Sequence, residues 1–229
     1  MLEAKQYQIG EQPQNLVIFL HGYNGTLDDH KYAIDWLRQY LQQAILITPQ
    51  APQICDKNPQ KRQWFGMLKY DSENKRSNPQ TPVEDIFAIY NDAALEIDFC
   101  AETINTFIDT QQRLFNIDDA HTFLIGFSQG AMLALYTALT RPEPLGGAFV
   151  LSGLVAGEFL LEQKISAEPQ VYMFHGTADL KVQSKTFPHS VEWLENHQIP
   201  VKQRIYSGLA HRINEDEIMT IATIINPKP

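Results

Sequence analysis

Residues 123–139 read FLIGFSQGAMLALYTAL. The first five residues form a short apolar run typical of a buried strand, and the last nine are apolar throughout, as in a buried helix. Between them stands Gly126-Phe127-Ser128-Gln129-Gly130, which matches the pattern G-x-S-x-G. This pattern is typical of a very sharp turn from a strand into a helix, where a Cβ atom on either glycine would collide. We therefore predict a strand over 121–127 and a helix over 129–140.

The same alternation extends along most of the chain. Short apolar runs bounded by Gly, Pro or Asn predict further strands at 16–20, 44–48, 146–151, 171–175 and 201–206. Periodic apolar segments predict helices after a cap at Thr26 or Asp28, at about 83–115, within 155–168, at 182–197 and at 214–225. Strands alternating with helices predict an α/β fold, with a mostly parallel central sheet and helices on both faces. We expect a single domain over residues 1–229.

Residues 49–82 interrupt this alternation. The stretch is rich in Pro, Asn, Gln, Lys and Arg, and its one apolar cluster is Trp64-Phe65-Gly66-Met67-Leu68. A long loop inside a compact domain is usually either functional or disordered, and the Trp-Phe pair favours a functional loop. The loop leaves the carboxyl end of a predicted strand, which is the edge where sites form in parallel sheets. We therefore expect it near the functional site.

The composition disfavours nucleic acids and anionic membranes as partners of this chain. The chain has 18 Lys and Arg against 27 Asp and Glu, a net charge of −9, and no basic run, which disfavours nucleic acid and anionic membranes. Its two cysteines predict neither a disulfide framework nor a metal site. No apolar run approaches the roughly 20 residues of a membrane span, and the N-terminus does not resemble a secretory signal. We expect a cytoplasmic protein with no integral membrane segment, metal or cofactor.

Ser128 is the candidate nucleophile. On such a turn the serine hydroxyl projects into a cleft at the top of the sheet. The following helix directs its free N–H groups and positive dipole end at the site, which favours a developing oxyanion. The alternative is a glycine-rich turn with an incidental serine.

The acid and the base follow by elimination. In proteins with this turn, the serine nucleophile is followed along the chain first by the acid, Asp or Glu, and then by the base, His. Only Asp179 and Asp216 are aspartates after Ser128, and no histidine follows Asp216. Asp179 lies in the segment directly after the predicted strand 171–175. His211 lies between a predicted strand and a predicted helix. The other histidines after Asp179, His189 and His197, fall in or at the end of the predicted helix 182–197. We therefore predict Asp179 as the acid and His211 as the base, against the alternatives of a surface-turn aspartate and a structural loop histidine.

An oxyanion hole needs two backbone donors. One is the amide of Gln129, directly after the nucleophile, and the other should come from the loop after strand 16–20, where we choose the amide of Tyr23. The histidines that end two of the strands, His21 and His175, are expected to be buried and hydrogen-bonded rather than basic.

Four segments resemble the phospholipase/carboxylesterase family, which includes acyl-protein thioesterases and bacterial carboxylesterases. They are Phe19-Leu20-His21-Gly22, Gly126-Phe127-Ser128-Gln129-Gly130, His175-Gly176-Thr177-Ala178-Asp179 and Gly208-Leu209-Ala210-His211. The resemblance covers nearly the whole chain and implies the α/β-hydrolase fold. Residues 49–52 and 62–65 also resemble the family's segment in which a tryptophan borders the substrate cleft, which implies a substrate-binding role for Trp64.

The sequence departs from the family pattern in three places. Ala131 stands where another glycine is usual, and the loop after His-Gly reads Tyr23-Asn24-Gly25 where the family often has Leu-Gly-Asp. After the acidic residue the family often has Pro followed by two apolar residues, but this chain has Leu180-Lys181-Val182. The first change is conservative, and the other two leave the acyl preference open.

These residues predict a serine hydrolase that cleaves carboxylic esters, with thioesters left open, through a Ser-His-Asp triad and an acyl-enzyme. The partner is then a small-molecule ester or acyl substrate, and a homodimer is left open. Alternatives are a lysophospholipase, an acyl-protein thioesterase, a peptidase and a non-catalytic binding protein on the same scaffold, because pocket shape decides among them.

Overall fold

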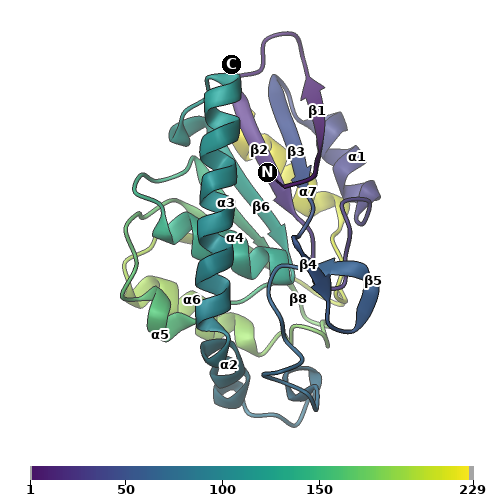
Figure 1. Cartoon of the computed structure of the whole chain (residues 1–229), viewed down its shortest axis with the longest axis vertical. Coiled ribbons are helices and arrows are strands. Elements are labelled where there is room, and N and C mark those ends of the chain that lie inside the picture. Colours follow the sequence, from purple (N-terminus) through teal and green to yellow (C-terminus); the bar gives the residue numbers. More distant parts are fainter. Residues whose placement is uncertain (1, 227–229) are drawn as a thin grey trace.

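The computed structural model describes residues 2–226, which form a twisted seven-stranded sheet between two layers of helices (Figure 1). The strands lie in the order β1-β3-β2-β6-β7-β8-β9. Their bounds are Ala4–Ile9 (β1), Asn15–Leu20 (β2), Ala44–Pro49 (β3), Thr122–Phe127 (β6), Gly147–Leu151 (β7), Val171–Gly176 (β8) and Val201–Tyr206 (β9). All neighbouring strands are parallel except β1, which pairs antiparallel with β3 at one edge. The predicted mostly parallel α/β sheet is confirmed.

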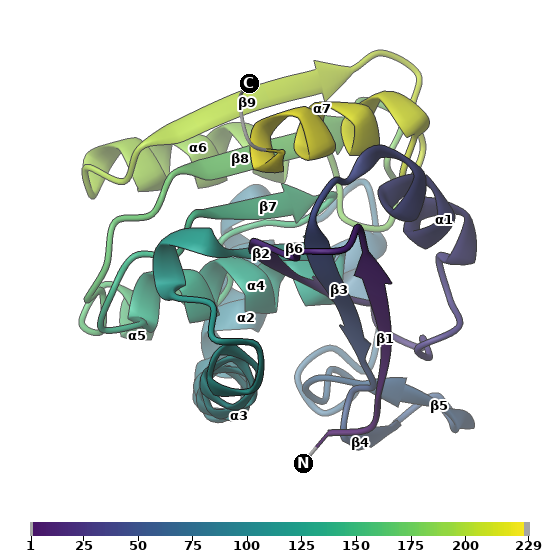
Figure 2. The same ribbon diagram turned by 90° about the horizontal axis from the view of Figure 1, so that it is seen from above.

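The helices cover both faces of the sheet, as predicted. One face carries α2 (Val83–Asp92), α3 (Ala94–Phe115), α4 (Gln129–Thr140), α5 (Glu158–Leu161) and α6 (Thr186–Asn196), and the other carries α1 (Lys31–Tyr40) and α7 (Glu215–Ile225). Figure 2 shows α1 and α7 together on the side of the sheet opposite α3 and α4. Alternate residues of β2 enter the two apolar clusters, with Leu16 and Ile18 on one face and Val17 and Phe19 on the other. This double burial explains why the central strands are apolar without alternation.

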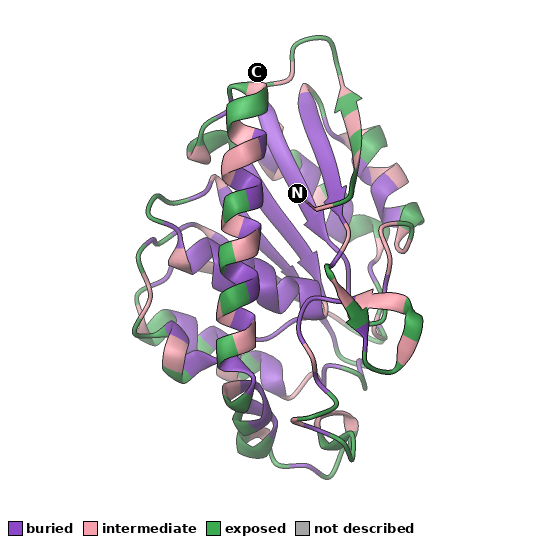
Figure 3. Ribbon diagram, viewed as in Figure 1, coloured by how far each residue is buried: buried purple, intermediate pink, exposed green. Residues whose placement is uncertain are grey.

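Helix α4 packs between the sheet and α3. Every residue from Gln129 to Leu139 is buried (Figure 3), and α4 contacts β6, β7 and α3. Such a helix is apolar on all sides because none of its faces reaches water. The bounds predicted for it, 129–140, are those of the structure. The start of α4, directly behind Ser128, therefore lies in the buried core of the protein.

Several helices differ from the sequence-based predictions. The helix predicted over 83–115 is two helices, because the helix is interrupted at Ala93 (φ −85°, ψ −1°). Helix α1 begins at Lys31 after His30, which is in the left-handed conformation (φ 59°), so neither Thr26 nor Asp28 caps it. Within 155–168 only α5 is helical, and α6 begins four residues later than predicted. Helix α7 begins with a capping box between Asn214 and Glu217.

The loop over 49–82 contains structure that the sequence did not indicate. Strands β4 (Gln53–Cys55) and β5 (Asn58–Gln63) form an antiparallel hairpin, and the short 3₁₀ helix η1 (Lys75–Ser77) follows. The hairpin is tied to the loop after β2 by a bridge between Gly25 and Arg62. In Figure 1 it lies beyond the carboxyl end of β3, at the expected edge of the sheet.

Among the described helices, none is both long and apolar enough to cross a membrane.

Candidate active site

Ser128 occupies the turn between β6 and α4 in a strained backbone conformation. Its φ of 55° and ψ of −118° are unusual for a residue with a side chain, and such a conformation costs about 1–3 kcal/mol. The two glycines permit the turn. A Cβ on Gly126 would lie 2.2 Å from the carbonyl oxygen of Gly130, and one on Gly130 would lie 2.3 Å from that of Leu20. The steric reason inferred from the pattern is confirmed.

The structure brings Ser128, His211 and Asp179 together in one hydrogen-bonded chain. The Ser128 hydroxyl lies 3.0 Å from Nε2 of His211, and Nδ1 of the same ring lies 2.7 Å from Oδ2 of Asp179. The Asp179 carboxylate is fully buried, and its other oxygen accepts from the backbone amides of Lys181 (2.8 Å) and Val182 (3.1 Å). Because the carboxylate accepts from Nδ1–H, it leaves Nε2 as the acceptor that faces the serine.

The loop after β8, which carries Asp179, is tied to the loop after β9, which carries His211. The amides of Thr177 and Ala178 donate to the carbonyls of Tyr206 and Leu209, both at 3.0 Å. In the opposite direction the amide of Gly208 donates to the Thr177 hydroxyl at 2.9 Å. The two loops are far apart in the chain but follow adjacent strands of the sheet. Together these bonds fix the position of Asp179 relative to His211.

His21 and His175 are buried and hydrogen-bonded, as predicted. His21 donates through Nδ1 to the Gly22 carbonyl (2.8 Å), and its Nε2 accepts from the amide of Ala51 (3.1 Å). His175 donates through Nε2 to the Val182 carbonyl at 2.9 Å. Burial lowers the pKa of both imidazoles, so both are neutral at pH 7. Neither approaches the Ser128 hydroxyl within hydrogen-bonding distance among the contacts of residues 2–226.

The two amides expected in the oxyanion hole flank Ser128. Gln129 is the first residue of α4, so its N–H has no carbonyl in a preceding turn. Tyr23 follows Gly22, which lies next to Ser128: a Cβ on Gly22 would be 3.4 Å from Cβ of Ser128. Within residues 2–226 neither amide donates a hydrogen bond to another protein group. Both donors are therefore left for a ligand oxygen.

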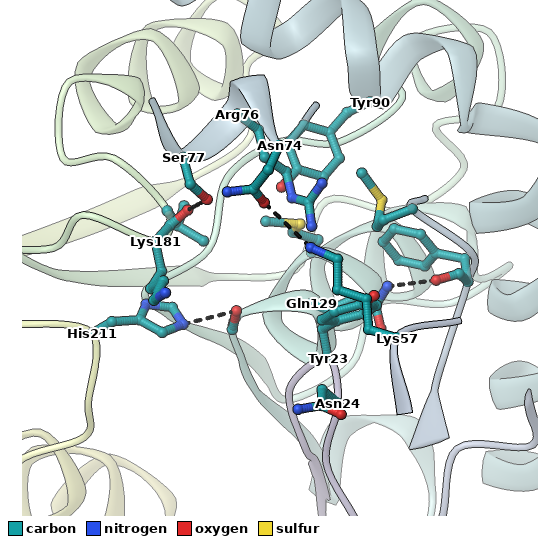
Figure 4. A pocket seen from close by; sticks show the side chains of 15 residues that line it. Tyr23, Asn24, Lys57, Asn74, Arg76, Ser77, Tyr90, Gln129, Lys181 and His211 are labelled. Atoms are coloured by element: carbon teal, nitrogen blue, oxygen red, sulfur yellow. Dashed lines mark hydrogen bonds between the residues drawn. The ribbon is translucent and has the colours of Figure 1, made fainter. Parts of the chain in front are cut away.

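A cavity of about 320 Å³ opens beside Ser128 and His211 (Figure 4). Its walls come from the loops after β2 and β8, the β4–β5 turn, the segment 65–77, α2 and α4. The apolar part of the wall is formed by Phe65, Met67, Tyr90, Met132 and Val182. The rest of the wall is polar, so the cavity offers both apolar and polar groups to a small molecule bound beside Ser128 and His211.

Trp64 does not line this cavity, and the substrate-binding role expected for it is wrong. Its side chain is only 1% exposed and donates through Nε1 to the His21 carbonyl at 2.7 Å. Its ring packs against the His21 ring, with the centroids 5.2 Å apart. The cavity wall is formed instead by the next residues, Phe65 and Met67. Trp64 is thus an anchor that joins the long loop to the turn after β2.

The side chain of Gln129 has a second role that sequence reasoning missed. Its Oε1 accepts from the amide of Trp64 (2.9 Å), and its Nε2 donates to the carbonyl of Phe65 (2.7 Å). The Trp64 carbonyl in turn accepts from the thiol of Cys100 on α3, at 2.8 Å. These partners are 36 to 65 residues apart in the chain, and no local pattern signals them. Gln129, directly after Ser128, therefore also holds the cavity wall.

Comparisons with known proteins find relatives along nearly the whole chain. The model of the family described as Phospholipase/Carboxylesterase matches residues 7–228. Acyl-protein thioesterase 1 of Saccharomyces cerevisiae is 26% identical over 91% of this chain and 90% of its own. Carboxylesterase SOBER1 of Arabidopsis thaliana is 26% identical over 77% of this chain and 72% of its own. Among solved structures, esterase PE8 superposes with a TM-score of 0.81 at 26% identity and covers 98% of this chain and 97% of its own.

Proposed function

The chain belongs to the phospholipase/carboxylesterase family and is a hydrolase of the carboxylesterase type, and on this basis we propose that it cleaves carboxylic esters through an acyl-enzyme formed on Ser128. The observation that carries the proposal is the unbroken hydrogen-bond chain from Ser128 through His211 to Asp179. It opens on a cavity large enough for a small substrate.

In the first half of the reaction, Oγ of Ser128 attacks the ester carbonyl while Nε2 of His211 takes its proton. The buried Asp179 carboxylate stabilises the imidazolium that forms. The carbonyl oxygen becomes an oxyanion and accepts from the amides of Tyr23 and Gln129, which are rigid donors at a helix start and a tight turn. Such donors favour the transition state because they need no reorganisation during the reaction.

In the second half, the imidazolium of His211 gives its proton to the leaving alcohol, and the acyl group remains on Ser128. Water then enters, His211 takes its proton, and the acyl-enzyme is hydrolysed to a carboxylic acid. The alcohol therefore departs on the side of the cavity next to His211, and the acyl group lies on the other side.

Labelling with a fluorophosphonate tests the nucleophile. The wild type should be labelled on Ser128, and Ser128→Ala should lose both the label and ester turnover, by about a thousandfold or more. The matched control is Ser152→Ala, which removes a buried serine that also has a positive φ (49°) and should keep labelling. Full turnover by Ser128→Ala would refute the proposal.

Thioesters are the second candidate substrate, because several relatives bear the name acyl-protein thioesterase. The same steps apply, except that a thiolate leaves more easily than an alkoxide and depends less on protonation by His211. Oxyester and thioester pairs with the same acyl group decide between the two. A thioesterase should show the higher kcat/KM on thioesters after correction for their faster uncatalysed hydrolysis.

A further inference from the structure

The cavity beside Ser128 is lined by cations in a protein that is acidic overall. Lys57, Arg76 and Lys181 all line it, and no aspartate or glutamate does, although the chain has a net charge of −9. The long-range field of such a protein repels anions. A carboxylate-free, cationic lining around the nucleophile is therefore a local feature and not a consequence of composition.

Arg76 is held rigidly at the cavity by a buried carboxylate. Asp71 is fully buried, lies 2.5 Å from Nη1 of Arg76, and also accepts from the amides of Lys75 and Arg76. The Arg76 carbonyl accepts from Nε2 of Gln183 at 2.7 Å, which joins this turn to the segment after Asp179. Both the side chain and the backbone of Arg76 are thus fixed from the protein side.

The Arg76 guanidinium keeps unused hydrogen-bonding capacity. It is only 11% exposed, and of its five N–H groups one donates to a protein acceptor among residues 2–226, the Asp71 carboxylate. Its Cζ lies 5.9 Å from the centre of the Tyr23 ring, and both residues line the cavity. A nearly buried guanidinium with unpaired donors at a cavity wall is suited to bind a carboxylate through two parallel hydrogen bonds.

Lys57 directs a second cation into the same part of the cavity. Figure 4 shows its ammonium group and the Arg76 guanidinium close to the Asn74 amide, across the cavity from His211. Nζ of Lys57 lies 3.5 Å from Oδ1 of Asn74 and pairs with no carboxylate among the described residues. Lys181, by contrast, lies beside His211 in Figure 4.

We infer that the acyl half of the substrate carries a carboxylate, which binds between Arg76 and Lys57. The inference rests on the proposed function, because it uses the side on which His211 releases the alcohol to assign the opposite side to the acyl group. The preferred substrates are then monoesters or thioesters of short dicarboxylic acids. A cavity of about 320 Å³ is at the lower end of the usual range for ligand sites, which agrees with a short acyl group.

A charge series with one leaving group tests this inference. Release of ethanol is measured from monoethyl glutarate, from its neutral isostere ethyl 5-oxohexanoate, and from the cationic ethyl 4-(trimethylammonio)butanoate. The wild type should favour the anion over the neutral ester by about tenfold or more in kcat/KM, and the cation should be the poorest substrate. Because the binding is electrostatic, the preference should fall as NaCl rises from 0.02 to about 0.5 M.

Variants locate the effect. Lys57→Gln should reduce the ratio of anionic to neutral kcat/KM by about fivefold, a typical value for one partly exposed charge. Asp71→Asn combined with Arg76→Gln removes the second cation without leaving a buried unpaired carboxylate, and should reduce the ratio further. The matched control is Lys202→Gln on β9, outside the cavity, which makes the same change in net charge and should leave the ratio unaltered. Each ratio comes from one protein preparation, so a loss of folded protein cancels.

The outcomes separate this inference from the proposed function. A wild-type ratio near or below one, with the neutral ester hydrolysed, would overturn the anionic acyl group and leave the esterase in place. An unchanged ratio in Lys57→Gln and in the double variant would do the same. A preference seen only for 3-carboxypropyl butanoate over 4-oxopentyl butanoate would refute the placement in the acyl half. No hydrolysis of any ester and no labelling of Ser128 would overturn both proposals.

Discussion

Replacing Trp64 with phenylalanine separates an anchor from a pocket residue. Trp64→Phe keeps an aromatic ring in the core but removes the Nε1–H that donates to the His21 carbonyl at 2.7 Å. Both groups are buried, so the carbonyl loses a partner that water cannot readily replace. Such a loss costs about 1–3 kcal/mol. In a chain of this length that corresponds to a fall in Tm of about 2–4 °C per kcal/mol.

The assay combines urea unfolding with kinetics on esters of graded acyl length. Trp64→Phe should lower the free energy of unfolding by about 1–3 kcal/mol, and the ratios of kcat/KM among acyl lengths should change by less than about twofold, because the ring does not line the cavity. Met67→Ala provides the contrast, because Met67 does line the cavity. It should alter discrimination among acyl lengths by about 1–3 kcal/mol. A change of acyl preference in Trp64→Phe as large as that in Met67→Ala, with an unchanged unfolding midpoint, would refute the anchor.

Three further perturbations test the site and its surroundings. Asp179→Asn should lower kcat by about 10³- to 10⁴-fold with a near-normal Tm, because the amide keeps an oxygen for the 181 and 182 amides but favours the wrong tautomer of His211. Burial raises the folded pKa of Glu217 to about 7 from an ordinary value near 4.5. The stability that Glu217 contributes is therefore complete below pH 4.5 and is lost as pH rises through about 7. Glu217→Gln keeps an acceptor for the Asn214 amide and should flatten the dependence of the unfolding free energy on pH. Dialysis against EDTA should leave ester turnover unchanged, since triad chemistry uses no metal, and a loss restored by added metal would contradict this.

The parts of the fold that could be predicted are those dictated by local chemistry. The bounds of α4 follow from an apolar segment that starts after a turn only glycine permits, and both constraints lie within Gly126 to Thr140. The positions of Asp179 and His211 follow from chain order and from the ends of strands. Strand β1 escaped prediction because half of its sequence, AKQYQI, is polar and none of its residues is buried at this edge of the sheet. The break at Ala93 carries no glycine or proline signal, so only tertiary packing reveals it.

The long loop shows where sequence reasoning ends. Its hairpin is built from NPQKRQ paired with QIC, which apart from Ile54 has few residues of strong strand preference, and a bridge from Gly25 to Arg62 joins the hairpin to the loop after β2. Trp64 was expected to contact the substrate, but in the structure its side chain is buried and does not line the cavity. Which neighbour of a buried side chain reaches the cavity depends on the path of the backbone, and hydrogen bonds from Gln129 set that path.

Gln129 joins two tasks that are usually discussed separately. Its amide is one proposed oxyanion donor, and its side chain holds the backbone of Trp64 and Phe65. Phe65 lines the cavity and Trp64 reaches back to the carbonyl of His21, two residues before the second proposed donor at Tyr23. The hydrogen bonds thus connect Gln129, one proposed oxyanion donor, through the cavity wall to His21, which lies two residues before the other proposed donor, Tyr23. A change in the wall that shifts this path should therefore alter kcat as well as substrate preference, whereas a change at Lys57 on the exposed hairpin turn should act mainly on preference.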